Sequence, residues 1–261
     1  PDGATIGYAA TGAFTMPVGT IIIKEFLYPT VAGDASTLVP METRFLVKRC
    51  DDAATGCENA IAWQGYSYQW NAEHTEATLL PDAASTLAWP YSEGGTQAMH
   101  VHTYPSRQQC TQCHNQAAGR VLGLQAGQLN RSLDYGGTVD NQLRALEHIG
   151  VLTGMASSEP MRLPTPNDQS FSLEQRARGY FHANCSHCHR AGGVQLTVDF
   201  RYDAPLSAMY ICNKLLPGDP DQSRLYRKDT YRGPAPMPAS GSEPGGGNQV
   251  PPLATLIQDP R

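Results

Sequence analysis

The 261-residue sequence has no excess of positive charge and no long apolar run. Its 19 Lys and Arg residues are outnumbered by 24 Asp and Glu residues, so the formal net charge is −5. A nucleic-acid-binding protein normally carries a basic patch, so this balance gives no reason to expect nucleic acid as a partner. The longest apolar stretch, TIIIKEFLY, is interrupted by Lys24 and Glu25. It falls well short of the roughly 20 residues that a membrane-spanning helix needs, and no membrane span is predicted.

Charged residues are also scarce, at 16% of the chain, whereas glycine and proline are abundant, with 25 and 20 copies. This composition indicates a loop-rich chain with long irregular connections between its regular elements. The length suits two or three small domains.

The seven cysteines fall into three groups. Four lie in a repeated motif, and Cys50 and Cys57 lie close together in the polar stretch CDDAATGC. We expect a local disulfide between Cys50 and Cys57, which requires an oxidising compartment. Cys212 is left over, either as a small buried residue or as a bridge between chains.

The expected fold class is α+β, with a change of character near residue 98. Residues 1–97 contain GTIIIKEFLY, RFLVKR and YSYQW, which are rich in β-branched and aromatic residues or alternate in polarity. They predict a β-sandwich or barrel-like domain without the repeated motif. Short helices follow, one of them with Ser172 and Gln175 in a capping box. We expect two small, mostly α-helical domains over residues 98–170 and 171–261.

The repeated motif is Cys-x-x-Cys-His, which occurs as CTQCHN and as CSHCHR. This is the attachment signature of c-type haem, in which two cysteine sulfurs form thioethers with the haem and the histidine ligates the iron. A zinc ribbon needs no histidine after each cysteine pair, and a thioredoxin-like dithiol would occur once. We therefore expect two covalently attached haem c groups. Their attachment and proximal residues are Cys110, Cys113 and His114 for the first, and Cys185, Cys188 and His189 for the second.

A sixth iron ligand is expected from a loop downstream of each motif. Met237 in GPAPMPAS and Met161 in SSEPMRLP follow their motifs at nearly equal intervals in proline-rich stretches. Met237 is the expected distal ligand of the second haem. The first haem has four candidate distal ligands: Met161, His100, His102 and His148. His187 occupies a variable position inside the second motif and is expected to face the ring edge or solvent.

Several stretches resemble a family of exported bacterial di-haem c-type cytochromes: TYPSRQQCTQCHNQAAGRVLGLQAGQLNR, NQLRALEHIGVL and RARGYFHANCSHCHRAGG. KLLPGDPDQSRLYRK with the later MP resembles the closing segment of class I cytochrome c domains, where that Met is the distal ligand. FTMPVGTIIIKEF, METRFLVKR and GYSYQWNAEHTEATLL resemble the segments before the haem domains in this family. The resemblance covers nearly the whole chain. It implies electron transfer and a periplasmic or extracellular location.

The favoured function is an electron carrier that exchanges electrons with redox proteins outside the cytoplasm, and enzyme activity is not expected. One alternative is a subunit of an extracellular cytochrome polymer or larger redox complex, in which Cys212 could link copies into a homo-oligomer or filament. Another is a di-haem enzyme of peroxidase type, which requires one haem with an open iron site.

Overall fold

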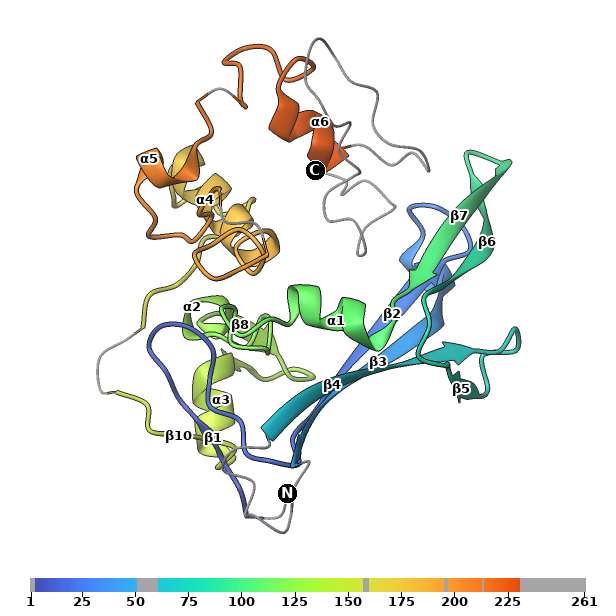
Figure 1. The fold of residues 1–261 in the computed structure, drawn as a ribbon, viewed down its shortest axis with the longest axis horizontal. Coiled ribbons are helices and arrows are strands. Elements are labelled where there is room, and N and C mark those ends of the chain that lie inside the picture. The colour runs from blue at the N-terminus through green and yellow to red at the C-terminus, as the bar shows by residue number, and fades with distance from the viewer. Residues whose placement is uncertain (1–2, 51–60, 157–159, 195–196, 213, 231–261) are drawn as a thin grey trace. The chain divides into compact units, whose positions relative to one another are not determined.

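The computed structural model describes residues 3–50, 61–156, 160–194, 197–212 and 214–230 (Figure 1). In chain order its elements are β1 (Ile6–Gly7), β2 (Ile21–Pro29), the 3-10 helix η1 (Ala35–Thr37), β3 (Leu38–Cys50), β4 (Ile61–Trp70), β5 (Ala77–Leu79), β6 (Ser85–Glu93), β7 (Thr96–Tyr104), α1 (Arg107–Cys113), α2 (Ala126–Leu129), β8 (Ser132–Asp134), β9 (Val139–Asn141), α3 (Gln142–His148), β10 (Leu152–Thr153), α4 (Leu173–Asn184), α5 (Leu206–Met209) and α6 (Arg224–Thr230).

The chain divides into two compact units. Unit 1 is formed by the described residues of Pro1–Ile23, Phe45–Tyr66 and Arg107–Pro205. Unit 2 is formed by the described residues of Lys24–Arg44, Ser67–Ser106 and Leu206–Arg261. Strands β2, β3 and β4 contribute residues to both units. The domain boundaries predicted at residues 97/98 and 170/171 stay predictions.

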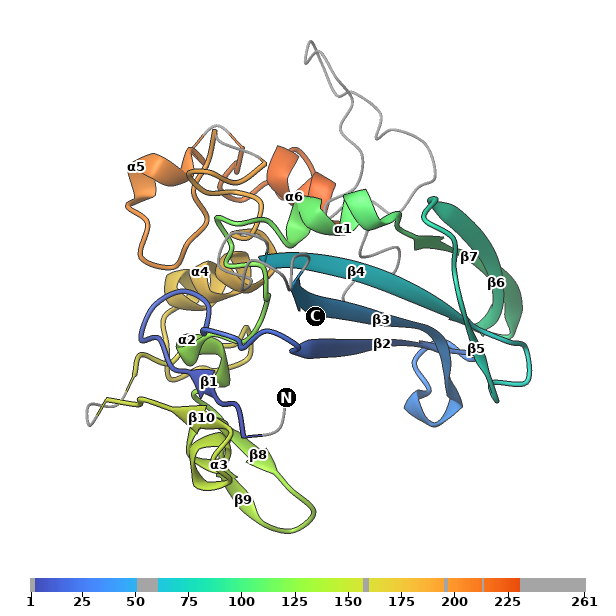
Figure 2. The ribbon, with the colours of Figure 1, turned by 60° about the horizontal axis from the view of Figure 1, so that its bottom comes forward.

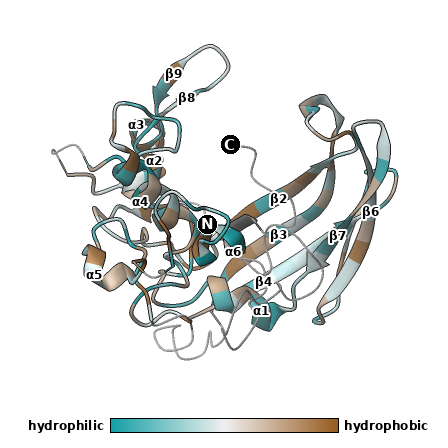
Figure 3. Cartoon of the chain, turned by 90° about the horizontal axis from the view of Figure 1, so that it is seen from above, coloured by the Kyte–Doolittle hydropathy of each residue, from teal (hydrophilic) through white to brown (hydrophobic). Residues whose placement is uncertain are grey.

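The largest sheet has the strand order β2-β3-β4-β5, and its strands lie side by side in Figure 2. β2 reads IIIKEFLYP, and β-branched and aromatic residues of this kind favour extended backbone. It is an edge strand of this sheet, and Figure 3 shows apolar stretches along it. Alternate side chains of β2 are exposed: Ile21, Ile23 and Leu27.

A long hairpin in unit 2 joins β6 to β7. Its antiparallel register runs from Ser85↔Tyr104 to Glu93↔Thr96. Gly94 and Gly95 form the two-residue turn with φ of 56° and 80°. Two successive positive φ angles match the twist of the flanking strands, and glycine adopts them without steric strain.

The core of unit 1 joins the N-terminal segment to the segment after the first motif. β1 pairs in parallel with β10, with Ile6 opposite Leu152. The buried apolar side chains of this core come from both segments: Phe14, Met16, Val121, Ala126, Leu143 and Leu152. Residues 6–16 are therefore part of the fold that carries the first motif.

Local sequence signals set the start of α4 and the end of α3. α4 begins with the predicted capping box, because the Ser172 and Gln175 side chains each accept from the other's backbone N–H. Its exposed Glu174 pairs with the half-buried Arg178 at 2.9 Å. α3 is followed by Gly150, whose φ of 73° ends the helix as its position predicts. No helix among the described residues has the length and apolar character to cross a bilayer.

The expected fold class is wrong, because two small, mostly α-helical domains do not form. Among the described residues strands predominate over helices, and α4, with 12 residues, is the longest helix. The segment after the first motif supplies the short helices α2 and α3, but it completes its core with β1 and residues 14–16 and adds the two-stranded β8–β9 sheet. The β structure predicted for the N-terminal region is compatible with β2 to β7.

Candidate functional site

Both motifs adopt the same local conformation, and both lie in unit 1. In the first, α1 carries Cys110 and Cys113, and the His114 N–H donates to the Cys110 carbonyl at 3.0 Å. In the second, which follows α4, the His189 N–H donates to the Cys185 carbonyl at 2.9 Å. Each motif is thus one helical turn. Residues three and four positions apart share a helix face, so each turn presents its two sulfurs and its imidazole on one side.

The ring of His114 is held in a defined orientation. Its Nδ1 lies 2.6 Å from the carbonyl oxygen of Arg120. A carbonyl can only accept, so Nδ1 carries the proton and Nε2 carries the lone pair. Histidines that ligate metals usually donate their other ring nitrogen in this way. The donor set therefore fits haem iron bound through Nε2 of His114.

An unusual turn brings that carbonyl to His114. Arg120 has φ of 67°, and Gly119 before it has φ of 77°. The turn is closed because the Arg120 N–H donates to the Asn115 carbonyl at 3.0 Å. A positive φ at a residue with a side chain is strained and is concentrated at functional positions. This strain fits a turn whose role is to orient the imidazole.

The imidazole of His189 packs against aromatic side chains. The ring of His189 is 5.1 Å from the ring of Phe200, which stacks on Phe181 at 5.1 Å. The Phe200 N–H also donates to the His189 carbonyl at 3.0 Å. Apolar packing of this kind keeps water from a metal-bound histidine.

Two glycines allow backbone to approach motif cysteines closely. A Cβ added at Gly65 of β4 would lie 2.7 Å from Sγ of Cys110. A Cβ added at Gly193 would lie 2.4 Å from the Cys188 carbonyl oxygen. A side chain at either position would displace the motif that it faces.

The two motifs meet within unit 1. The Sγ atoms of Cys113 and Cys188 and a ring nitrogen of His187 all lie within 4.8 Å of one another. The Asn115 side-chain amide donates to the His187 carbonyl at 2.8 Å, and the Cys188 thiol lies 3.9 Å from the Gln112 carbonyl. The expectation that His187 faces only a ring edge or solvent is therefore incomplete, because it is half-buried in this cluster.

The thiols of the cluster influence each other's protonation. A hydrogen bond from Cys188, opposed by burial and reinforced by His187, lowers the pKa of Cys113 to about 4. Hydrogen bonding to Cys113 and burial raise the pKa of Cys188. One thiolate beside one thiol and an imidazole offers three donors to a soft metal ion, whereas a structural zinc site uses four.

The structure describes one of the two methionines expected as distal ligands, Met161. Met237 lies outside the described residues. Met161 is 55% exposed, on a segment that the Leu163 N–H ties to the Gly127 carbonyl at 2.8 Å. His148 is an exposed residue at the C-terminal end of α3. These three assignments as distal ligands stay predictions.

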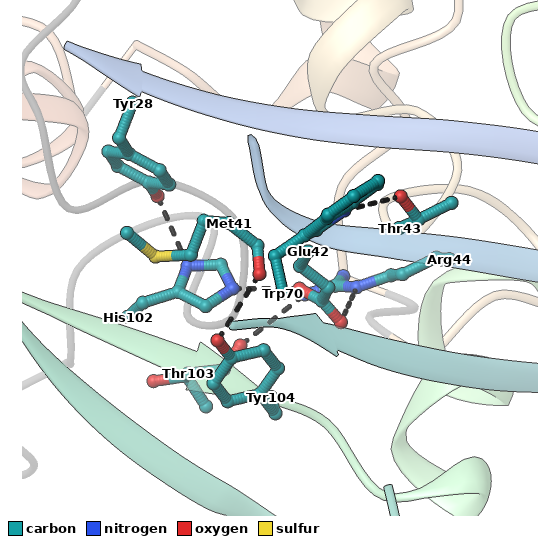
Figure 4. Close-up of polar contacts among 9 residues, drawn as sticks. All are labelled: Tyr28, Met41, Glu42, Thr43, Arg44, Trp70, His102, Thr103 and Tyr104. Carbon is teal, nitrogen blue, oxygen red and sulfur yellow. Dashed lines mark hydrogen bonds and ion pairs between the residues drawn. The ribbon is translucent and has the colours of Figure 1, made fainter. Parts of the chain in front are cut away.

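His102 belongs to a buried polar network in unit 2 (Figure 4). Its Nε2 lies 2.7 Å from a carboxylate oxygen of Glu42, and its Nδ1 lies 3.3 Å from the hydroxyl of Tyr28. Arg44 donates twice to the same carboxylate, at 2.7 Å each. Both ring nitrogens of His102 are thus engaged, which argues against it as an iron ligand.

His100 lies beside this network and is 4% exposed. Its ring lies against the ring of Tyr28, tilted by 30°, with centroids 4.4 Å apart. Its Nε2 has no hydrogen-bond partner among the described residues. Burial, with the neighbouring His102, lowers the pKa of His100 to about 4.

Acid is therefore expected to destabilise the protein through His100. An unfolded histidine titrates near 6.5, so between pH 6.5 and about 4 the unfolded chain binds a proton that the folded chain does not. Stability should fall by up to about 3 kcal/mol across this window. We expect His100→Phe to flatten the pH dependence of the urea-unfolding free energy. Parallel curves for wild type and His100→Phe would contradict this origin.

The cysteines outside the motifs differ in state. Cys50 is disulfide-bonded, and its predicted partner Cys57 lies outside the described residues. Cys212 is an exposed thiol, so the expectation of a small buried residue is wrong. The alternative, a bridge between chains, stays a prediction.

No protein-family model, no curated protein and no solved structure matches the chain. Its function is therefore argued from the chemistry of the site itself.

Proposed function

We propose that this protein is a di-haem c-type cytochrome that carries electrons between redox proteins outside the cytoplasm. The observation that carries the proposal is the His114 ring, whose Nδ1 donates at 2.6 Å to the Arg120 carbonyl. This ring ends a helical turn that also presents Cys110 and Cys113. The second motif repeats this helical turn with Cys185, Cys188 and His189.

Haem c, when attached, supplies one-electron exchange at iron. The cysteine pairs would anchor each haem, and His114 and His189 would bind iron from the proximal side. The Arg120 carbonyl keeps the His114 imidazole in one tautomer, and Phe200 shields the His189 imidazole. Met237 is the proposed distal ligand of the second haem. Methionine ligation would raise its reduction potential relative to ligation by two histidines.

The acidic balance of the chain fits a basic redox partner. The net charge is −5 before haem propionates are counted. Complementary charge speeds encounter, and weak, small interfaces suit electron-transfer partners that must separate again.

A metal-ion site is the second candidate, because Cys113, His187 and Cys188 offer three donor atoms within 4.8 Å of one another. It is less favoured because it would leave Cys110 and Cys185 outside the cluster and give no role to the tautomer of His114.

Haem content decides between these functions. We expect protein produced in a host that attaches c-type haem to contain two haems per chain by pyridine haemochrome assay and intact mass. Zinc without haem would overturn the proposal and favour the metal-ion site. The dithionite-reduced spectrum should not change under carbon monoxide, because a carrier holds both irons with two strong ligands. A shift in about half of the haem would instead indicate one open iron and a peroxidase-type enzyme.

A further inference from the structure

We propose that Cys113 and Cys188 bring the two haem-attachment sites together at one shared edge, so that the two haems form a single electronically coupled pair. The inference rests on the proposed function, because it concerns groups that those cysteines would hold. Its ground is that the two Sγ atoms and the His187 ring nitrogen lie within 4.8 Å of one another. A thioether joins haem carbon to Sγ by one bond, so the attached edges meet where the sulfurs meet.

Contacts around the sulfurs fix the register between the motifs. The Asn115 side-chain amide donates to the His187 carbonyl at 2.8 Å. Gly192, with φ of 77°, lies where an added Cβ would be 3.3 Å from Cβ of Ala117. The turns that follow the two motifs are thus in direct contact within unit 1. These contacts, and not only the interaction between the two thiols, hold the sulfurs near each other.

The junction selects one cysteine from each motif. Cys113 and Cys188, the second cysteines of the two motifs, belong to the cluster. Cys110 instead faces the backbone of β4 at Gly65. The two motifs therefore meet through equivalent positions, which brings the same edge of each attached group to the junction.

Circular dichroism in the Soret band tests the coupling, because two chromophores held close in a fixed orientation mix their transitions. The reference spectra come from two single-haem proteins: Cys110→Ala with Cys113→Ala, and Cys185→Ala with Cys188→Ala. We expect the wild-type spectrum to differ from their sum by an antisymmetric couplet. A wild-type spectrum equal to the sum would overturn the inference.

A redox titration of the wild type gives the same test if a single-haem protein fails to mature. The couplet needs both haems in the same oxidation state. It should therefore be lost once each chain has taken up its first electron, when half of the Soret absorbance change is still to come. Strictly proportional dichroism and absorbance changes would overturn the coupling. Two haems per chain without a couplet would leave the proposed function standing, whereas a chain without haem would remove its basis.

Two asparagines provide a matched pair of variants. Asn115→Ala removes the hydrogen bond to the His187 carbonyl and should reduce the couplet amplitude with two haems retained. Asn184→Ala removes a 2.9 Å hydrogen bond to the Tyr180 carbonyl within one helix and should leave the amplitude unchanged. Equal effects of the two variants would contradict a role for the contact between the motifs.

Discussion

Replacing Cys185 and Cys188 together with alanine is expected to halve the haem content, from two per chain to one. Both thioethers of the second site are lost, while the first site keeps Cys110, Cys113 and the oriented ring of His114. The readout is pyridine haemochrome per chain, with intact mass showing one haem fewer.

The control for this experiment is Cys212→Ala, which removes an exposed thiol outside both motifs and should leave two haems. An unchanged haem content in the double variant would refute the assignment of the second attachment site. Loss of both haems would show that the first site depends on contact with the second motif. The haem content of the Asn115→Ala variant, which lacks one hydrogen bond between the motifs, would then test that dependence.

Replacing Glu42 with alanine is expected to destabilise the protein by about 3–5 kcal/mol, because it leaves the buried His102 and the half-buried Arg44 without their anion. The Glu42 side chain is 0% exposed and accepts from Arg44 and His102 (Figure 4). Arg44 also packs over the ring of Phe26 at 4.2 Å, so its guanidinium is held in place and cannot readily turn to water. The measurement is the free energy of unfolding in urea.

Glu25→Ala on β2 is the matched control, because Glu25 is an exposed carboxylate, and its loss should change stability by less than about 0.5 kcal/mol. Burial alone would raise the pKa of Glu42, but hydrogen bonds from His102 and Arg44 outweigh burial and lower it. Its stabilisation is therefore present above the pKa of an unfolded glutamate and is lost as the pH falls through the lowered value. Equal stabilities of Glu42→Ala and Glu25→Ala would show that the network contributes little.

Local features of this fold could be predicted from the sequence. The capping box at Ser172 and Gln175 and the end of α3 at Gly150 depend on residues within one helical turn of each other. The local sequence is therefore sufficient to predict them. β2 is similarly a run of strand-forming residues. The pairing of β1 with β10 could not be predicted, because Ile6 and Leu152 are far apart in sequence and each strand has only two residues. That missed pairing is one reason why the helical domain expected over residues 98–170 was wrong.

The candidate site likewise has features that could be predicted from neighbouring residues and others that depend on contacts between distant residues. Cys-x-x-Cys-His is a contiguous signature, so its six cysteine and histidine positions could be proposed without a structure. The contact of Cys113 with Cys188 joins residues far apart in the sequence. The motif itself does not indicate which of its two cysteines lies at that contact. The role of the Arg120 carbonyl was also missed, although Gly119 beside it was a signal for an unusual turn. In unit 2, the alternation of His100 and His102 on one strand face was visible, but their burial beside Glu42 was not.

The pairing of β1 with β10 also imposes an order of events on a chain that emerges N-terminus first. Phe14 and Met16 appear early, but their partners Leu143 and Leu152 emerge after the first motif has passed. Cys110 and Cys113 thus stay accessible during an interval when the surrounding core cannot yet close. Contacts of such long sequence separation form slowly, which lengthens that interval. The topology therefore keeps the first motif accessible for longer than a self-contained helical domain would, which suits the proposed attachment of haem there.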